Sequence, residues 1–237
     1  MAKILVSGAS SGLGRYLHAN LAGDKFYRDN AEKNPSVDVC YDMVIHCAFG
    51  QPNKNQTYNE YIEYQKDICQ KIIKYKCKKL VFISSIECHL NESIQSEYAK
   101  AKRIIEKLII KNCKDFLILR VGLLFGSKMR PNQMLRIAIE DSPNLTLDNQ
   151  STFSYVEYKD VLESILSNQI GTKTIVANRL MSLKEVGLYF SSKPKWGGYK
   201  YYSPPISMNY KNIYQYTDIN IDPLLRLSSF VKNKGWK

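Results

Sequence analysis

The feature that most constrains the fold is a glycine-rich turn near the amino terminus, between the apolar, strand-like residues 3–7 and a stretch with leucines at helical spacing. Gly8 permits a tight turn, Gly12 lets backbone N–H groups approach a phosphate, and Gly14 lets the helix pack closely on the strand. The pattern predicts a turn that binds the pyrophosphate of a dinucleotide. The candidate cofactor contacts are Gly8, Ser10, Ser11, Gly12, Leu13 and Gly14.

Residues 26–29 have the composition of a very short second strand, and they end in a basic and an acidic side chain, Arg28 and Asp29. Dinucleotide-binding folds place an acidic residue here for the adenosine ribose, or a basic residue for a ribose phosphate. Arg28, with Ser10 and Ser11 nearby, favours NADP over NAD. Arg28 is therefore a candidate cofactor contact, and a plain surface charge is the alternative.

Residues 43–48 form an apolar run that we expect to be a buried strand beside the first one. Its end supplies two more candidate cofactor contacts, Cys47 and Ala48. A single histidine within such a run, here His46, is more often a hydrogen-bonded core residue than a catalyst. Only residues 30–42 lie between this run and the previous one, too few for the usual strand and two helices. The sequence therefore predicts a trimmed doubly wound sheet.

A third apolar run, residues 80–83, ends in Ser84 and Ser85, and Tyr98 and Lys102 follow on a stretch of helical periodicity. Residues four apart on a helix lie one turn from each other on the same face. If the run is a buried strand, a hydroxyl, a phenol and an ammonium converge at its carboxyl end. We therefore take Ser85, Tyr98 and Lys102 as a candidate proton-transfer site.

The rest of the chain continues the alternation, with helical spacing over residues 58–78 and an apolar run at 116–119. Such alternation predicts a parallel sheet with right-handed crossovers. Ser182 and Glu185 form a capping-box signature that opens a helix through Phe190. The predicted fold class is α/β, a Rossmann-like doubly wound parallel sheet with a small, truncated carboxyl-terminal substrate region. Residues 1–126 would form the dinucleotide-binding core, and residues 127–237 a substrate-binding region interleaved with the remaining core strands in a single compact unit.

Composition narrows the function classes. The 237 residues are 44% hydrophobic and carry a net charge of +12, with lysines scattered along the chain rather than in an arginine-rich block. We therefore expect a solvated basic surface and no nucleic-acid partner. The six cysteines include no CxxC pair, which indicates reduced thiols and no metal site. No apolar run reaches the roughly twenty residues of a membrane helix, so we expect a cytoplasmic protein without a membrane partner.

Together the segments VSGASSGLG and SS…YAKAK resemble the short-chain dehydrogenase/reductase superfamily. Beyond Lys102 the segments LILRVGLLFG, FSYVEYKDV and MSLKEV are similar to the extended branch, the NAD-dependent epimerase/dehydratase family that modifies sugar nucleotides. The resemblance covers nearly the whole chain. The glycine spacing and the Ser-to-Tyr spacing are those of the classical branch.

This resemblance implies roles for the site residues. Tyr98 would be the general acid/base, with a phenol pKa lowered by the ammonium of Lys102 and by the positive nicotinamide. Lys102 would also hold the nicotinamide ribose, and Ser85 would bind the reacting oxygen. Ser84 would exchange roles with Ser85 if the strand register differs by one residue.

The chain also departs from the extended pattern. Tyr61, with Asn59 close by, stands near the position of a usual asparagine, and residues 121–123 lack another one. Lys128, Arg130 and Arg136 are then only candidates for the substrate pyrophosphate.

The leading functional hypothesis is an NAD(P)-dependent oxidoreductase that reduces a keto group on a nucleotide-activated sugar. One alternative is a nucleotide-sugar epimerase that retains its cofactor through the cycle. A second is a non-catalytic NAD(P)-sensing module, against which the intact Ser85, Tyr98 and Lys102 argue. The resemblance further implies a homodimer that pairs through the helices at residues 58–78 and 96–112.

Overall fold

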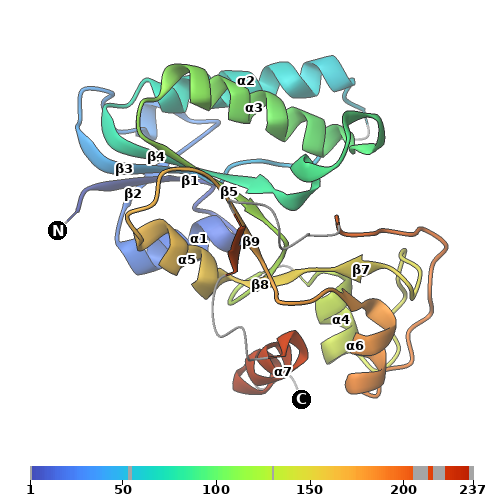
Figure 1. Ribbon diagram of the computed structural model, residues 1–237. Coiled ribbons are helices and arrows are strands. Elements are labelled where there is room, and N and C mark those ends of the chain that lie inside the picture. The colour runs from blue at the N-terminus through green and yellow to red at the C-terminus, as the bar shows by residue number, and fades with distance from the viewer. Residues whose placement is uncertain (1, 53–54, 130, 205–212, 216–221, 235–237) are drawn as a thin grey trace.

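The computed structural model of the chain describes residues 2–52, 55–129, 131–204, 213–215 and 222–234. Its centre is a parallel sheet of seven strands in the order β11-β9-β5-β4-β3-β1-β2 (Figure 1). The strands are β1 (Ile4–Ser7), β2 (Asp24–Phe26), β3 (Tyr41–His46), β4 (Cys77–Ser85), β5 (Phe116–Val121), β9 (Gly171–Val176) and β11 (Ile213–Gln215). The predicted α/β class with a Rossmann-like parallel sheet is confirmed.

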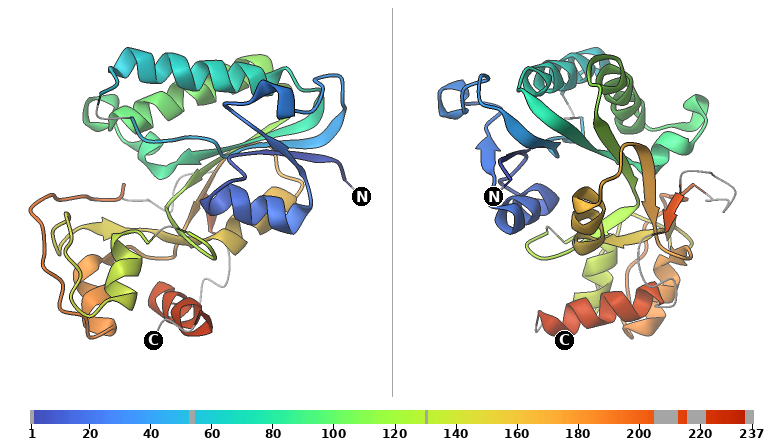
Figure 2. Two further views of the ribbon diagram at one scale, coloured as in Figure 1. Left: turned by 180° about the vertical axis from the view of Figure 1, so that it is seen from behind. Right: turned by 60° about the vertical axis from the view of Figure 1, so that its left-hand side comes forward.

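Helices cover both faces of the sheet. Figures 1 and 2 show α2 (Tyr58–Ile73) and α3 (Glu97–Asn112) side by side on one face, and α1 (Gly12–Leu21) and α5 (Tyr158–Leu166) on the other. The central strands β1, β4 and β5 therefore bury side chains on both of their faces. On β4, Leu80 and Phe82 belong to the core beneath α2 and α3, and Val81 and Ile83 to the core above α1 and α5.

The strand order reverses around β1. The chain passes from β1 to β2 on one side, and then to β3 on the other side of β1. In open α/β sheets ligands bind at such a switch point, outside the carboxyl ends of the strands. The register aligns the ends of β1 and β3, because Ser7 pairs with His46, and β4, whose Phe82 pairs with His46, continues beyond them to Ser85.

The second strand lies earlier than predicted. The sequence placed it at residues 26–29, whereas β2 ends at Phe26. Beyond it the Asn34 side chain takes the backbone hydrogen bonds of Tyr27, accepting from its N–H at 2.6 Å and donating to its carbonyl at 2.9 Å. Between β2 and β3 there is one short helix, η1 (Ala31–Lys33), as expected for a trimmed sheet.

The carboxyl-terminal residues build a smaller layer beyond the sheet's carboxyl edge (Figure 1). The strands β6 (Leu123–Phe125) and β8 (Tyr155–Glu157) pair in parallel, and β7 (Thr152–Phe153) and β10 (Met181–Ser182) pair antiparallel. With α4 (Gln133–Ile139), α6 (Leu183–Tyr189) and α7 (Pro223–Asn233) they enclose a separate core. The predicted capping box is present, since Ser182 and Glu185 each bond the other's backbone N–H.

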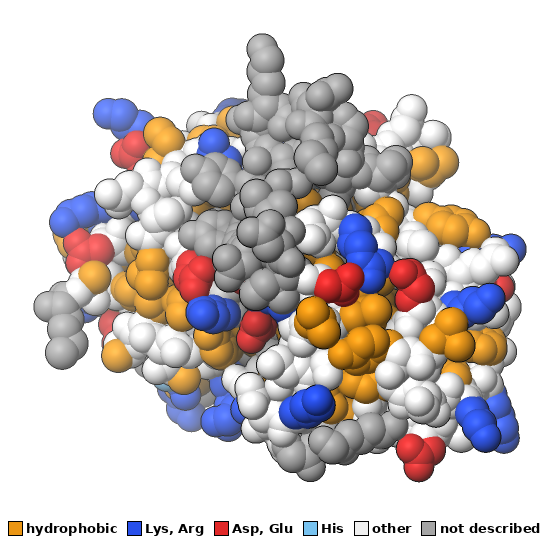
Figure 3. Space-filling model, turned by 60° about the horizontal axis from the view of Figure 1, so that its bottom comes forward, with side chains coloured by type: hydrophobic (Ala, Val, Ile, Leu, Met, Phe, Trp, Pro, Cys, Tyr) orange, Lys and Arg blue, Asp and Glu red, His pale blue; other side chains and the backbone are white. Residues whose placement is uncertain are grey.

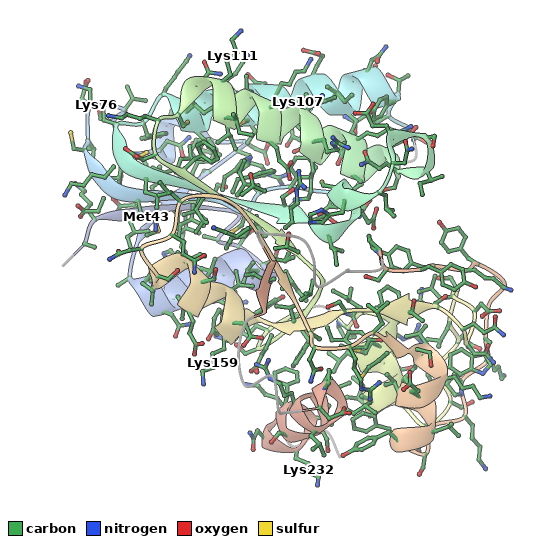
Figure 4. All side chains as sticks on the ribbon, viewed as in Figure 1. Met43, Lys76, Lys107, Lys111, Lys159 and Lys232 are labelled. Carbon is green, nitrogen blue, oxygen red and sulfur yellow. The ribbon has the colours of Figure 1, made fainter. Side chains whose placement is uncertain are left out.

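Many of the lysines lie on the outside of the molecule. Figure 4 shows the labelled lysines at the periphery, with Lys107 and Lys111 on α3, Lys159 on α5 and Lys232 on α7. On the face in Figure 3, acidic and basic side chains are interspersed. Among the described helices, none combines the length and the apolar character needed to cross a membrane.

Adding one methyl group at Gly14 tests how closely α1 packs against the turn that follows β1. A Cβ on Gly14 would lie 2.3 Å from the Gly8 carbonyl oxygen, a backbone atom that cannot move aside alone. We expect Gly14→Ala to lower the free energy of unfolding by about 1–3 kcal/mol, measured by urea titration. Gly198→Ala is the control, because a Cβ there meets nothing within 4 Å. Equal stability of the two variants would contradict the close packing.

Candidate active site

A cleft of about 710 Å³ runs along the carboxyl ends of β1, β3, β4 and β5. It brings together all the residues that the sequence singled out as catalytic or cofactor-binding. They are Gly8, Ser10, Ser11, Gly12, Leu13, Gly14, Arg28, Cys47, Ala48, Ser85, Tyr98 and Lys102. The remaining lining comes from the β3–α2 loop, from the ends of β4 and β5, from the start of α5 and from the carboxyl-terminal layer.

The amino-terminal end of the cleft is shaped for a phosphate group. Gly8 and Gly12 have positive φ angles of 76° and 53°, which side chains rarely adopt. Helix α1 begins here with no acidic residue in its first turn, and the side chain of its N-cap, Ser11, makes no capping hydrogen bond. The first N–H groups of a helix attract anions. The turn therefore fits a pyrophosphate.

The floor between β1 and β3 is held by one hydroxyl. Ser7 Oγ accepts from the N–H groups of Cys47 (3.1 Å) and Ala48 (3.2 Å), and it lies 2.9 Å from His46 Nδ1. A hydroxyl that accepts twice has its own hydrogen left to donate, so it donates to Nδ1. His46 is fully buried and packs against Phe82, which confirms the structural interpretation of this histidine.

Lys102 is the buried cation of the site. Its side chain is 2% exposed, and its Nζ donates to the Ile83 carbonyl at 2.6 Å. The ammonium also lies over the rings of Phe49 (4.2 Å), Phe82 (5.0 Å) and Tyr98 (5.0 Å). Burial lowers the pKa of Lys102 to about 8, because water stabilises an ammonium better than aromatic rings and one carbonyl do.

Tyr98 lies one turn before Lys102 and lines the cleft, with the Phe49 ring edge-on at 5.4 Å. Its pKa is raised, first by burial and then by the nearby Tyr61, Glu87 and Cys88. This direction is opposite to the one expected from the resemblance, in which Lys102 and the nicotinamide lower the pKa. In the protein itself, the loss of water around the phenol outweighs the ammonium.

The two serines at the end of β4 differ in their hydrogen bonds. Ser84 Oγ donates to Glu106 Oε1 at 2.5 Å and is buried. Ser85 Oγ accepts from the Glu87 N–H at 3.2 Å, which caps the short helix η2 (Ile86–His89) and leaves its O–H hydrogen available. Of the two, Ser85 is the better placed to bind a reacting oxygen.

Behind these serines lies a buried ion pair. Arg120 of β5 holds Glu106 of α3 with two hydrogen bonds, Nε to Oε1 at 3.0 Å and Nη2 to Oε2 at 2.6 Å. Arg120 Nη1 is 3.5 Å from His89 Nδ1, and His89 Nε2 is 2.8 Å from Thr174 Oγ1 on β9. The network joins α3 to three other elements at the carboxyl edge of the sheet.

The far half of the cleft is largely apolar. Tyr201 stacks on Phe153 with ring centroids 4.6 Å apart and an interplanar angle of 12°. Near the glycine turn, Tyr158 begins α5, and a Cβ on Gly12 would lie 3.4 Å from its hydroxyl.

The sequence did not identify four aromatic residues that line the cleft, Phe49, Phe153, Tyr158 and Tyr201. The only signal for two of them was their place in FSYVEYKDV, the segment similar to the extended branch.

The structure also shows where the residues lie at which the sequence departs from the extended pattern. Tyr61 is buried, and its hydroxyl donates to the Gly50 carbonyl at 2.7 Å. Arg136 pairs with Glu140 on α4, with Nε to Oε1 at 2.8 Å, and is not among the lining residues. Its assignment to a substrate pyrophosphate is therefore wrong, because Glu140 already occupies its guanidinium. Lys128 is exposed, and Arg130 lies outside the described residues. Within the described chain, no three His, Cys, Asp or Glu side chains gather as a metal site would require.

Comparisons with known proteins agree at the level of structure. No family model and no curated protein sequence matches this chain. A UDP-N-acetylglucosamine 4-epimerase from Methanobrevibacter ruminantium M1, solved with UDP-N-acetylmuramic acid, is 16% identical with a TM-score of 0.70, over 98% of this chain and 97% of that chain. A UDP-N-acetylglucosamine 4-epimerase from Bacillus cereus is 16% identical with a TM-score of 0.65, over 98% and 95%. A dTDP-glucose 4,6-dehydratase from Bacillus anthracis, solved with NAD, is 12% identical with a TM-score of 0.69, over 100% and 98%.

The sheet order and the glycine turn define a dinucleotide-binding fold of the Rossmann class. More narrowly, the chain has the fold of the solved nucleotide-sugar epimerases and dehydratases described above. The fold implied by the resemblance noted in the sequence is confirmed.

Burial of His46 predicts a loss of stability in acid. Burial lowers the pKa of His46 to about 3 in the folded protein, so between that value and the unfolded value of about 6.5 the unfolded chain binds the extra proton. Stability contributed by neutral His46 is thus complete above about pH 6.5 and falls as the pH is lowered. From pH 7 to pH 5 we expect His46 to cost about 2 kcal/mol of unfolding free energy.

Urea unfolding of the wild type and His46→Gln at pH 7 and pH 5 measures this cost. The glutamine does not titrate, so the variant should lose about 2 kcal/mol less than the wild type over this interval. An equal loss of unfolding free energy in both proteins would show that folding does not lower the pKa of His46.

Proposed function

We propose that the protein is an NAD(P)-dependent enzyme that acts on a nucleotide-activated sugar, with Tyr98 as the general acid/base. The observation that carries the proposal is the convergence of the glycine turn, Ser85, Tyr98 and Lys102 on one cleft. The fold shared with nucleotide-sugar epimerases and dehydratases supports the substrate class.

The cleft fits a dinucleotide along its length. The glycine turn and the amino terminus of α1 would hold the pyrophosphate, and Arg28 lies toward the adenosine end. Cys47 and Ala48 would line the middle, and Lys102 would hold the nicotinamide ribose. A bound nicotinamide would supply the two-electron acceptor and donor for a sugar carbon.

The chain's own residues would handle the proton. Tyr98 would accept the proton of the sugar hydroxyl as a carbonyl forms, and would return it when the carbonyl is reduced. The ammonium of Lys102, 5.0 Å from the Tyr98 ring, would stabilise the phenolate in that interval. Ser85 would donate its free O–H hydrogen to the reacting oxygen and so fix its position.

Among reactions of this kind, we favour epimerisation with a retained cofactor. Two of the three solved structures described above are 4-epimerases, and they cover nearly the whole chain. The reductase hypothesis, first from the sequence, remains the second candidate because the same Ser, Tyr and Lys would serve it. Epimerisation would leave the cofactor bound and unchanged over a full cycle, whereas reduction would consume one reduced cofactor per turnover.

Purification without added nucleotide separates these reactions. An epimerase should arrive with dinucleotide bound and should interconvert UDP-sugars with none added, whereas a reductase should consume added NADPH or NADH. The assay should offer UDP-glucose, UDP-N-acetylglucosamine and dTDP-glucose in turn. An intact protein that binds dinucleotide but turns over no sugar nucleotide would leave the non-catalytic sensor as the function.

Replacing Tyr98 by phenylalanine tests its role. Tyr98→Phe removes the only phenol proposed to carry the proton, so kcat should fall by about 100-fold or more. The dissociation constant of the dinucleotide, measured by calorimetry, should change little because the ring remains. Wild-type activity in this variant would exclude Tyr98 as the acid/base.

The cofactor preference depends on Arg28. Arg28 and Asp29 both line a hollow of about 270 Å³ beside Gly8 and Ser10, where the 2′-phosphate on the adenosine ribose of NADP would meet the guanidinium. Arg28→Ala should raise the Kd of NADP(H) by about tenfold and that of NAD(H) by much less. Lys33→Ala, at an exposed lysine of η1, is the control. Equal losses for both dinucleotides would contradict a preference for NADP.

The cytoplasmic location and the homodimer through α2 and α3 stay predictions. So does the division of the chain into residues 1–126 and 127–237.

A further inference from the structure

Glu87 is bonded to three parts of the site at once, two through its carboxylate and one through its backbone N–H. Its Oε2 accepts from Ser96 Oγ at 2.6 Å, and its Oε1 accepts from the Tyr201 hydroxyl at 3.0 Å. Its backbone N–H donates to Ser85 Oγ at 3.2 Å. Glu87 is half-buried on η2, directly after the strand that ends in Ser85.

Two of these partners are themselves fixed. Ser96 is the N-cap of α3 and accepts from the Ala99 N–H at 3.2 Å, so it sets where the helix with Tyr98 begins. The backbone of Tyr201 is pinned to the carboxyl-terminal layer, since its N–H donates to Ser151 Oγ at 3.1 Å and its carbonyl accepts from the Thr152 N–H at 2.9 Å. One carboxylate therefore joins the layer beyond the sheet to the helix that carries Tyr98.

Tyr201 also forms part of the cleft wall. Its ring lines the cleft and stacks on Phe153, in the half beyond Ser85 and Tyr98. A sugar held over Tyr98 would be bounded on this side by the Tyr201 ring. The hydrogen bond from its hydroxyl to Glu87 is one of the contacts that position this ring.

We propose that Glu87 is a positioning residue of the reaction, which holds Tyr201 of the substrate half against the amino terminus of α3 and so fixes the space for the sugar over Tyr98. The role of Glu87 in catalysis rests on the proposed function. The hydrogen-bonded bridge from Ser96 through Glu87 to Tyr201 can be tested without a substrate. Glu87 acts through Ser96 and Tyr201 and is assigned no contact with the sugar.

The charge of Glu87 provides a second signature. Its carboxylate is among the causes that raise the pKa of Tyr98, after burial and Tyr61. The other titratable groups around the phenol are Cys88 on η2, Lys102 on α3, and Tyr201. Removing the negative charge should therefore lower the pKa of Tyr98, whereas removing only the Tyr201 hydroxyl leaves that charge in place.

Two variants separate the bridge from the charge. Tyr201→Phe deletes one hydroxyl and keeps the stacked ring, so the fold should be retained. Glu87→Gln keeps the size but has a single amide oxygen, which cannot replace both carboxylate oxygens as acceptors for Ser96 and Tyr201. Tyr202→Phe, at an exposed neighbour in the same segment, is the matched control.

The first measurement is hydrogen–deuterium exchange on the free protein. Tyr201→Phe and Glu87→Gln should speed amide exchange several-fold in residues 86–89 and 199–203, and Tyr202→Phe should not. Unchanged exchange in both bridge variants would overturn the proposal. This result holds whether or not a substrate is known, so it stands apart from a failure of the proposed function.

The second measurement is the pH profile of turnover on a UDP-sugar. Both bridge variants should lower kcat by about tenfold with a Kd for the dinucleotide within about twofold of the wild type. In the plot of kcat against pH, the midpoint that reports ionisation of Tyr98 should move to lower pH by about one unit in Glu87→Gln. It should not move in Tyr201→Phe. A midpoint that stays in place in Glu87→Gln, or a kcat unaffected in Tyr201→Phe, would refute the positioning role. If the wild type turns over no sugar nucleotide, the proposed function is refuted instead. The hydrogen–deuterium exchange experiment then tests the Glu87 bridge by itself.

Discussion

The site depends on the parallel register of β1, β3 and β4. Because Ser7, His46 and Phe82 lie side by side across the sheet, β1 and β3 end level with each other while β4 continues to Ser85, and the turns after them open at one edge. The Ser7 hydroxyl fastens the first two ends by bonding both N–H groups that follow β3. A shift of one residue in this register would turn every side chain to the opposite face.

The same edge concentrates buried charge. Lys102 is surrounded by aromatic rings and one carbonyl, while one helical turn later Glu106 is neutralised by Arg120. Isolated buried charges are costly, and a paired one loses much of its stabilisation when a single partner is removed. The helix that carries Tyr98 is thus held in place by an ion pair on its sheet side and by a hydrogen-bonded cap at its start.

Local patterns predicted the parts of the fold that depend on neighbouring residues. The glycine turn, the capping box at Ser182 and the four-residue spacing of Tyr98 and Lys102 are properties of short segments, and the structure contains each of them. The end of β2 was placed too late because the side chain of Asn34, several residues away, replaces the strand partner of Tyr27.

Other features could not be read from the sequence because they are contacts between distant residues. Glu87 meets Tyr201 across 114 positions, and Glu106 meets Arg120 only because α3 crosses β5. The raised pKa of Tyr98 in the protein itself could not be read from the sequence for the same reason. The phenol's loss of water comes from the packed surroundings that include Phe49 and Tyr61, and the sequence alone gives no measure of that packing.

The lengths of the strands bear on how copies of this molecule behave in a crowded solution. Both outermost strands, β2 and β11, have three residues, whereas β4 in the middle has nine. A sheet edge recruits other chains by offering a row of unpaired N–H and C=O groups. Within the described residues each rim offers only a short row, so edge-to-edge stacking into aggregates would gain few hydrogen bonds. The longest strand is the one best shielded from such encounters.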